Sequence, residues 1–88
     1  MNVLSGIKTW LWVNSLRIQA KLGVPVAQYN LGILYFQVED YAEALRWLQK
    51  AGEQDFSPAY IVLGEMYSRG EGVPQDQEMA LKWFAAGP

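Results

Sequence analysis

Apolar residues recur along this chain every three or four residues, with polar residues between them, which is the spacing of amphipathic helices. Residues 25–37 and residues 58–69 each begin with a proline, which the first turn of a helix tolerates because its N–H has no helical partner there. Ser57 stands before the second segment as a predicted N-cap, and Gly70 follows it as a predicted terminator. These signals predict two helices of similar length, each of which we call helix A.

Each helix A is followed by a second predicted helix, helix B, which an aspartate opens. Asp40, with Glu43 three residues later, forms the pattern of a capping box before the stretch YAEALRWLQKAG. Asp76 holds the corresponding place before QEMALKWFAAG. Because the connections are short, each A and B helix should lie side by side and antiparallel.

The two helix pairs repeat one another in sequence. The spacing between equivalent residues is 32 up to Tyr35 and 36 from Asp40 onward, because the second copy has the longer loop SRGEGVPQ. Equivalent positions are Ala27 and Ala59, Leu31 and Leu63, Gly32 and Gly64, Tyr35 and Tyr67, Ala44 and Ala80, and Trp47 and Trp83. An ordered series with one insertion predicts a duplicated helix–loop–helix unit.

The whole pattern predicts an all-α fold, an α/α solenoid of two antiparallel helix pairs preceded by one long N-terminal helix. About five helices would form a single domain, with residues 1–23 as leading helix, residues 25–56 as first repeat and residues 57–88 as second repeat. A glycine inside a helix costs about 1 kcal/mol relative to alanine, so Gly32 and Gly64 require a compensating contact. We expect them to bring helix A close to helix B, with Ala44 and Ala80 opposite.

Composition excludes several classes of function. Cysteine and histidine are both absent, which excludes disulfides, thiolate or imidazole metal sites, and catalysis by either residue. The net charge of −2 gives no overall attraction to nucleic acid, although residues 1–23 carry three basic residues and no acid. Asn14, Ser15 and Arg17 interrupt the apolar stretch that a signal peptide would need, so we expect mature structure there and a cytoplasmic protein.

The second copy contains a motif of fixed spacing, formed by Ala59, Leu63-Gly64, Tyr67, Gly70, Gly72-Val73, Asp76, Ala80, Trp83 and Ala86. This motif resembles the Sel-one-like repeat, a relative of the tetratricopeptide repeat. The first copy has FQVED in place of the glycine-rich loop and is similar in its proportions to a tetratricopeptide unit. The resemblance implies an α/α solenoid that acts as an adaptor, and bacterial members often serve signalling, secretion or envelope assembly.

Helix A forms most of the inner surface of helical solenoids, so its positions outside the repeat motif are candidates for contact with a peptide or partner protein. These candidates are Gln28, Asn30, Ile33, Phe36, Gln37, Tyr60, Val62, Glu65, Met66 and Arg69. The aromatic residues at repeat positions, Tyr35, Tyr67, Trp47 and Trp83, are expected to pack within the fold instead.

The leading helix carries more apolar residues than one buried stripe needs. We favour packing and contact with protein, and the alternative is a helix lying on a membrane surface with tryptophan and lysine at the interface. Stacked repeats need covered ends, so we expect self-association through Trp10, Trp12, Met79, Trp83 and Phe84.

No set of residues with the pattern of a catalytic site emerges. The acid pairs fall at helix N-termini, where negative charge complements the helix dipole, and the glycine-rich loop lacks the Lys-Ser/Thr continuation of a phosphate-binding loop. We therefore predict a non-catalytic protein–protein interaction module without cofactor or metal, acting as an adaptor or scaffold. The alternative is a self-associating or membrane-peripheral protein that acts through its basic, tryptophan-rich N-terminal helix.

Overall fold

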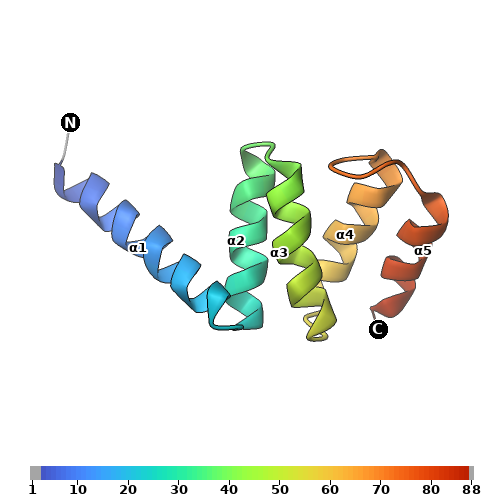
Figure 1. Cartoon of the computed structure of the whole chain (residues 1–88), viewed down its shortest axis with the longest axis horizontal. Coiled ribbons are helices and arrows are strands. Elements are labelled where there is room, and N and C mark those ends of the chain that lie inside the picture. Colours follow the sequence, from blue (N-terminus) through green and yellow to red (C-terminus); the bar gives the residue numbers. More distant parts are fainter. Residues whose placement is uncertain (1–2, 88) are drawn as a thin grey trace.

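The computed structural model describes residues 3–87, which form a row of five α-helices without strands. The helices are α1 (Val3–Lys21), α2 (Pro25–Gln37), α3 (Tyr41–Glu53), α4 (Pro58–Arg69) and α5 (Gln77–Ala86). They follow one another along the longest axis of a molecule that measures 47 × 23 × 18 Å (Figure 1). The predicted all-α fold, with a leading helix and two antiparallel pairs, is confirmed.

The helix ends show which local signals operate. The Asp76 carboxylate accepts a hydrogen bond from the backbone N–H of Met79 at 3.0 Å, as an N-cap does. The Asp40 carboxylate accepts from the backbone N–H of Glu43 at 3.4 Å, whereas the Glu43 side chain binds Arg46 and leaves the capping box half formed. The predicted cap at Ser57 is wrong, because its side chain makes no capping hydrogen bond.

The loop between α4 and α5 folds back onto the preceding unit. Gly70 ends α4 in the left-handed conformation with φ 72°, as predicted, and Gly72 has φ 77°. A Cβ atom placed on Gly72 would lie 2.9 Å from the backbone oxygen of Tyr41, at the first turn of α3. The longer loop of the second unit therefore braces the first unit.

The core runs as two clusters along the stack. One cluster lies at the junction of α3 and α4 and consists of Ala44, Leu48, Ala51, Ala59, Leu63 and Met66. The other joins α1, α2 and α3 and consists of Leu16, Ala20, Ala27, Leu31 and Trp47. The helices in the middle of the row therefore bury residues against neighbours on both sides, as in other stacked repeats.

The helical glycines give close approach between the helices of each pair. A Cβ on Gly32 would lie 2.7 Å from Cγ of Leu48 and 3.3 Å from the backbone oxygen of Ala44, so any side chain there would force Leu48 to shift. A Cβ on Gly64 would overlap the ring of Phe84. The expected close contact is confirmed, and Phe84 occupies the place in the second pair that Leu48 has in the first.

The turn into α2 repeats the turn into α4. Gly23 and Asp55 have positive φ of 94° and 62°, and their backbone N–H groups donate to Ala20 and Gly52 oxygens, both at 3.0 Å. Gly23 and Asp55 are also 32 residues apart in the sequence. The helix α1 therefore holds the same place relative to α2 that a helix B, α3, holds relative to α4.

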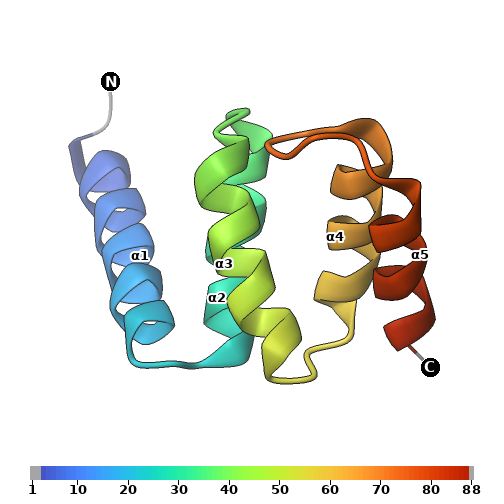
Figure 2. The same cartoon turned by 45° about the vertical axis from the view of Figure 1, so that its right-hand side comes forward.

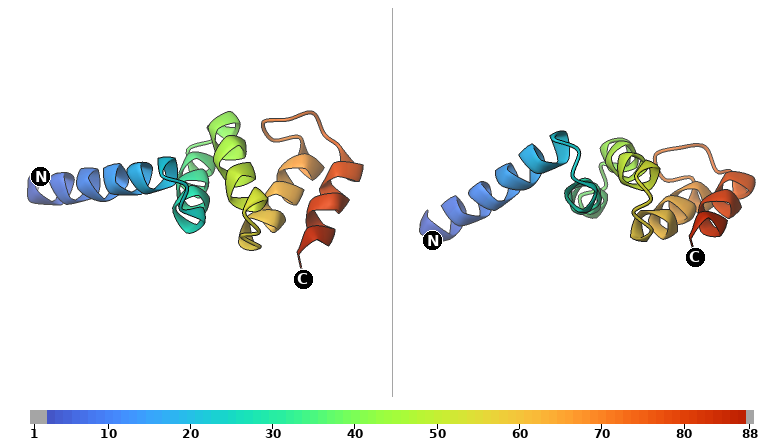
Figure 3. Two further views of the ribbon diagram at one scale, coloured as in Figure 1. Left: turned by 60° about the horizontal axis from the view of Figure 1, so that its bottom comes forward. Right: turned by 90° about the horizontal axis from the view of Figure 1, so that it is seen from below.

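The first half of α1 lies apart from the other helices. Figure 3 shows its N-terminal end pointing away from the row formed by α2 to α5, and in Figure 2 α1 stands at one side of that row. Residues 3–12 are all exposed, and within α1 only Leu16 and Ala20 are buried. The packing expected for the leading helix is therefore confined to its second half.

Candidate partner-binding surfaces

The surface positions proposed on helix A fall into three groups in the structure. Exposed positions are Asn30, Gln37 and Arg69. Partly buried positions are Ile33, Phe36, Val62 and Glu65. Buried positions, contrary to the exposure expected of them, are Gln28, Tyr60 and Met66.

The three buried residues have structural partners. Gln28 is 5% exposed, donates to the backbone oxygen of Ala20 at 3.2 Å and accepts from Gln54 Nε2 at 2.9 Å. Tyr60 donates its hydroxyl to Asp55 at 3.1 Å, and Met66 is fully buried in the core. These side chains join neighbouring helices and turns, so they take no part in the binding proposal below.

Three pairs of the remaining positions are equivalent in the two units. Asn30 and Val62, Ile33 and Glu65, and Gln37 and Arg69 are each 32 residues apart, so they occupy matching places on α2 and α4. We call these six positions, together with Phe36, the helix-A face. Ile33, Phe36 and Val62 touch the core cluster while remaining partly exposed, and the Phe36 ring packs 5.3 Å from that of Tyr41.

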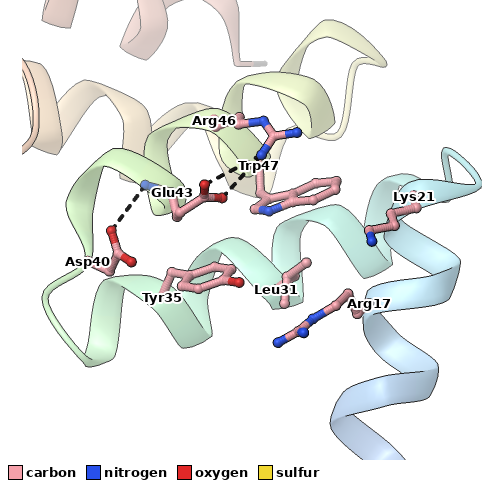
Figure 4. Close-up of a pocket in the computed structure, with 8 residues that line it drawn as sticks. All are labelled: Arg17, Lys21, Leu31, Tyr35, Asp40, Glu43, Arg46 and Trp47. Carbon is pink, nitrogen blue, oxygen red and sulfur yellow. Dashed lines mark hydrogen bonds and ion pairs between the residues drawn. The ribbon is translucent and has the colours of Figure 1, made fainter.

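A hollow, which we call the notch, lies between α1, α2 and α3 and has a volume of about 390 Å³ (Figure 4). Its lining residues are Arg17, Lys21, Leu31, Tyr35, Asp40, Glu43, Arg46 and Trp47. Leu31 and Trp47 are almost completely buried and form its floor, while the charged side chains surround them. Sequence reasoning did not select the notch because three separate helices build it.

The charges around the notch are unequally compensated. Asp40 caps α3, and Glu43 pairs with Arg46 at 3.4 Å, while the Arg46 guanidinium lies 5.2 Å from the centre of the Trp47 ring. The pair of Glu43 and Arg46 is the only ion pair within residues 3–87. The side chains of Arg17 and Lys21, one turn apart on α1, have no ionic or hydrogen-bonding partner in that range. In the sequence, the notch could have been suspected only from the four-residue spacing of Arg17 and Lys21, which places both side chains on one face of α1.

The residues expected to mediate self-association divide between the two ends of the row. Trp10 and Trp12 are exposed on α1. Phe84 is exposed on α5, although its ring also covers Gly64, and Met79 is partly buried. Trp83 is partly buried and stacks on Tyr60 with ring centres 5.9 Å apart, which confirms a packing role for it.

Two tyrosines outside the notch have raised pKa values. Burial raises the pKa of Tyr41 above 10.0, the charges of Glu39 and Glu71 raise it further, and so does a hydrogen bond with Glu71. Burial also raises the pKa of Tyr60, followed by its hydrogen bond with Asp55 and the charge of that carboxylate. Both tyrosines are therefore neutral structural groups at ordinary pH.

Neither a membrane-spanning helix nor a metal cluster is found in the described part of the chain. No helix between residues 3 and 87 is long and apolar enough to cross a bilayer. The same residues include no group of three or more acidic side chains that could hold a metal ion.

Comparison with protein families gives the same repeat organisation. The Sel1 repeat matches twice, over residues 25–56 and residues 57–86. The chain belongs to the Sel1 repeat family. This fold is a helical repeat module that is commonly used for protein interaction and is generally a non-catalytic scaffold.

Two solved structures are similar to this Sel1 repeat chain. One is a protective antigen of uropathogenic Escherichia coli strains with an SLR fold, at 40% identity and a TM-score of 0.80. The other is a Sel1 repeat protein from Oxalobacter formigenes, at 33% identity and a TM-score of 0.77. Each match covers 84% of this chain, which corresponds to 17% of the first structure and 60% of the second. The comparison with curated proteins found no match.

Proposed function

We propose that this Sel1 repeat chain is a non-catalytic protein-interaction module, an adaptor that binds a peptide or partner protein through its helix-A face. The observation that carries the proposal is the repetition of this face on α2 and α4 at matching positions. Ile33, Phe36 and Val62 supply apolar area that is already packed on the core. Such side chains lose little conformational freedom on binding, so they suit the role of anchors.

Polar residues border these anchors. Asn30, Gln37 and Arg69 are exposed on the same two helices, at positions one or two turns away from Ile33 and Val62. A partly apolar centre with a polar border is the usual arrangement of a protein-binding surface. The absence of histidine and cysteine also leaves this surface without the commonest catalytic groups.

Affinity purification from an extract of the producing organism tests this assignment. The full chain is used as bait beside an Arg69→Glu variant, with Lys82→Glu as a matched charge reversal on α5. We expect recovery of the specific partner to fall about fivefold with Arg69→Glu, since a border charge contributes about 1 kcal/mol. Lys82→Glu should recover the partner normally, and both variants should keep the unfolding temperature. Equal recovery with both variants would contradict the helix-A face.

A second candidate function is self-association through the two ends of the row. The position on α1 that corresponds to Ala44 on α3 is Trp12, which is 56% exposed where Ala44 is fully buried. A tryptophan at this place is much larger than the alanine of α3 and adds exposed apolar surface to that of Trp10. The other contributing residues would be Met79, Trp83 and Phe84 on α5.

Light scattering at high micromolar concentration tests this second function. We expect a dimer or larger species that becomes monomeric in a Trp12→Lys variant, with Thr9→Lys as control for added charge on the exposed half of α1. A monomer at all concentrations, combined with binding of the chain to vesicles that depends on Trp10 and Lys8, would favour the membrane-surface alternative instead.

A further inference from the structure

The junction of α1 with α2, where the notch lies, differs from the junction of α3 with α4. Arg17 on α1 corresponds to Gln49 on α3, because α1 and α3 enter their following helices through equivalent turns. Gln49 Nε2 donates to the hydroxyl of Tyr67 at 3.1 Å and so bridges α3 and α4. Tyr35 corresponds to Tyr67, but no hydrogen bond joins Arg17 to Tyr35 in the described residues. The junction of α1 with α2 therefore lacks the polar bridge that joins α3 to α4.

The α1 side of the notch also carries more positive charge than the equivalent part of α3. Lys21 on α1 corresponds to Glu53 on α3, so both differences from α3 add positive charge on the α1 side. Within the notch, three cations stand against two carboxylates, and both carboxylates are already engaged. Figure 4 shows Arg17 and Lys21 extending from α1 toward the α2 and α3 side chains. The uncompensated charge is thus positive and directed into a hollow.

An apolar hollow adjoins the notch. It has a volume of about 200 Å³ and shares Arg17, Leu31 and Tyr35 with the notch. Its remaining lining residues are Val13, Leu34 and Val38, which are all apolar. A molecule that fills both hollows would place an anionic group near Arg17 and Lys21 and an apolar group a few ångströms away.

We propose that the notch binds a peptide segment that presents a carboxylate next to a large apolar side chain. The carboxylate pairs with Arg17 and Lys21, which present their donors from one side, and the apolar side chain covers Leu31 and Tyr35. The combined volume suits one or two side chains of a peptide. This site lies on α1 and α3 as well as α2, so it is independent of the helix-A face.

The remaining charges of the notch favour a singly charged group over a phosphate. Asp40 and Glu43 form the wall opposite Arg17, and they would repel a group that carries nearly two negative charges. A carboxylate carries one negative charge, which matches the excess of one cation in the lining. It can be the side chain of aspartate or glutamate or the end of a peptide chain, and these sources share the same recognition chemistry.

A synthetic library of random pentapeptides with free carboxyl ends, selected on the immobilised full chain, tests the proposal. We expect the retained peptides to place an acidic residue or the chain end beside leucine, phenylalanine or tryptophan. The selected peptides are then titrated in three forms: unchanged, with an amidated end, and with acidic residues replaced by their amides. Loss of binding in one form identifies which carboxylate is recognised.

The deciding variant is Arg17→Gln, which installs the residue type that α3 has at the equivalent position, Gln49. We expect about tenfold weaker binding of the selected peptides, because a charge-assisted hydrogen bond is lost. Adding Lys21→Glu should abolish binding, whereas Lys8→Gln, which removes the same charge elsewhere on α1, should leave it unchanged. Arg17 and Lys21 are exposed, and circular dichroism should show unchanged helix content.

Three results would overturn the proposal. These are the absence of any retained peptide, binding that survives removal of every carboxylate, and equal binding by the Arg17→Gln variant. Inorganic phosphate is added as a competitor, and displacement of the peptide by phosphate at concentrations far below those needed with acetate would overturn the preference for a carboxylate. Sensitivity of the same peptides to Arg69→Glu instead of Arg17→Gln would assign them to the helix-A face.

Discussion

At the scale of single residues, positions without a side chain determine how closely the helices of a pair approach. Gly32 lies against Leu48 and Gly64 lies against the ring of Phe84, in each case where an added Cβ would meet its neighbour. The same residue type at Gly6 has nothing within 4 Å. Close packing therefore constrains Gly32 and Gly64, the two positions that the repeat pattern predicts, and leaves Gly6 unconstrained.

Replacing Gly32 by alanine should lower stability. The new Cβ would lie 2.7 Å from Cγ of Leu48, and the required shift should cost about 1–3 kcal/mol, more than alanine gains in helix propensity. Chemical denaturation measures the change in the free energy of unfolding. Gly6→Ala is the matched control, and it should be neutral or slightly stabilising. Equal effects of the two substitutions would contradict the close contact.

Tyr41 and Tyr60 should make the fold sensitive to alkali. Their pKa values in the folded chain lie above the ordinary value of 10.0, so their contribution to stability is complete below that value and is lost as pH rises through the folded pKa. We expect urea denaturation to show a steeper fall between about pH 9 and about pH 11 for the natural chain than for a double Tyr41→Phe, Tyr60→Phe variant. Parallel curves would contradict the role of these hydroxyls.

At the scale of the helix, the ends are set by local signals that the sequence displays. The helices α2 and α4 begin at Pro25 and Pro58, as predicted, because proline suits the first helical turn, and Gly70 ends α4. The burial of Gln28, Tyr60 and Met66 could not be predicted in this way. It depends on turns and helices from neighbouring units, which no periodicity within one helix encodes.

The notch shows the same limit of sequence reasoning. Its unpaired basic residues, Arg17 and Lys21, are visible in the sequence within an excess of basic residues before residue 24, but the floor of Leu31 and Trp47 comes from two other helices. The spatial relation between Arg17 and Tyr35 follows from the angle between α1 and α2. A hollow built by three helices therefore requires coordinates, whereas the repeat itself required only spacing.

The aspartate caps provide a test at this scale. Asp76→Ala removes a hydrogen bond of 3.0 Å to the first turn of α5 and should cost about 1 kcal/mol. Ser57→Ala should change stability far less, because the Ser57 side chain makes no capping hydrogen bond. The measurement is the shift in the midpoint of thermal unfolding. A larger effect at Ser57 than at Asp76 would contradict the observed helix ends.

At the scale of the whole molecule, contacts join each helix mainly to its neighbours in the row. The two core clusters meet around α2 and α3, while the first half of α1 touches neither. In such a linear arrangement, stability is a sum of units and of interfaces between neighbours, so the ends open more easily than the middle. The molecule should therefore lose structure from its ends.

Hydrogen exchange followed by mass spectrometry measures this gradient. We expect amides of residues 3–12 to exchange fastest among the helical segments and amides near Leu48 and Leu63 to exchange slowest, because these leucines are fully buried at the junction of α3 and α4. The gradient should flatten near residues 3–12 at high protein concentration if copies associate through α1. Uniform protection along all five helices would contradict the linear arrangement.

The tryptophan at position 12 also limits how this scaffold can be enlarged. A solenoid can be lengthened by fusing a further helical hairpin that packs on its end. At the α1 end, Trp12 occupies the position at which α3 has the buried Ala44. We expect a hairpin grafted ahead of α1 to pack more closely on a Trp12→Ala variant than on the natural side chain, because α3 buries an alanine at the equivalent position.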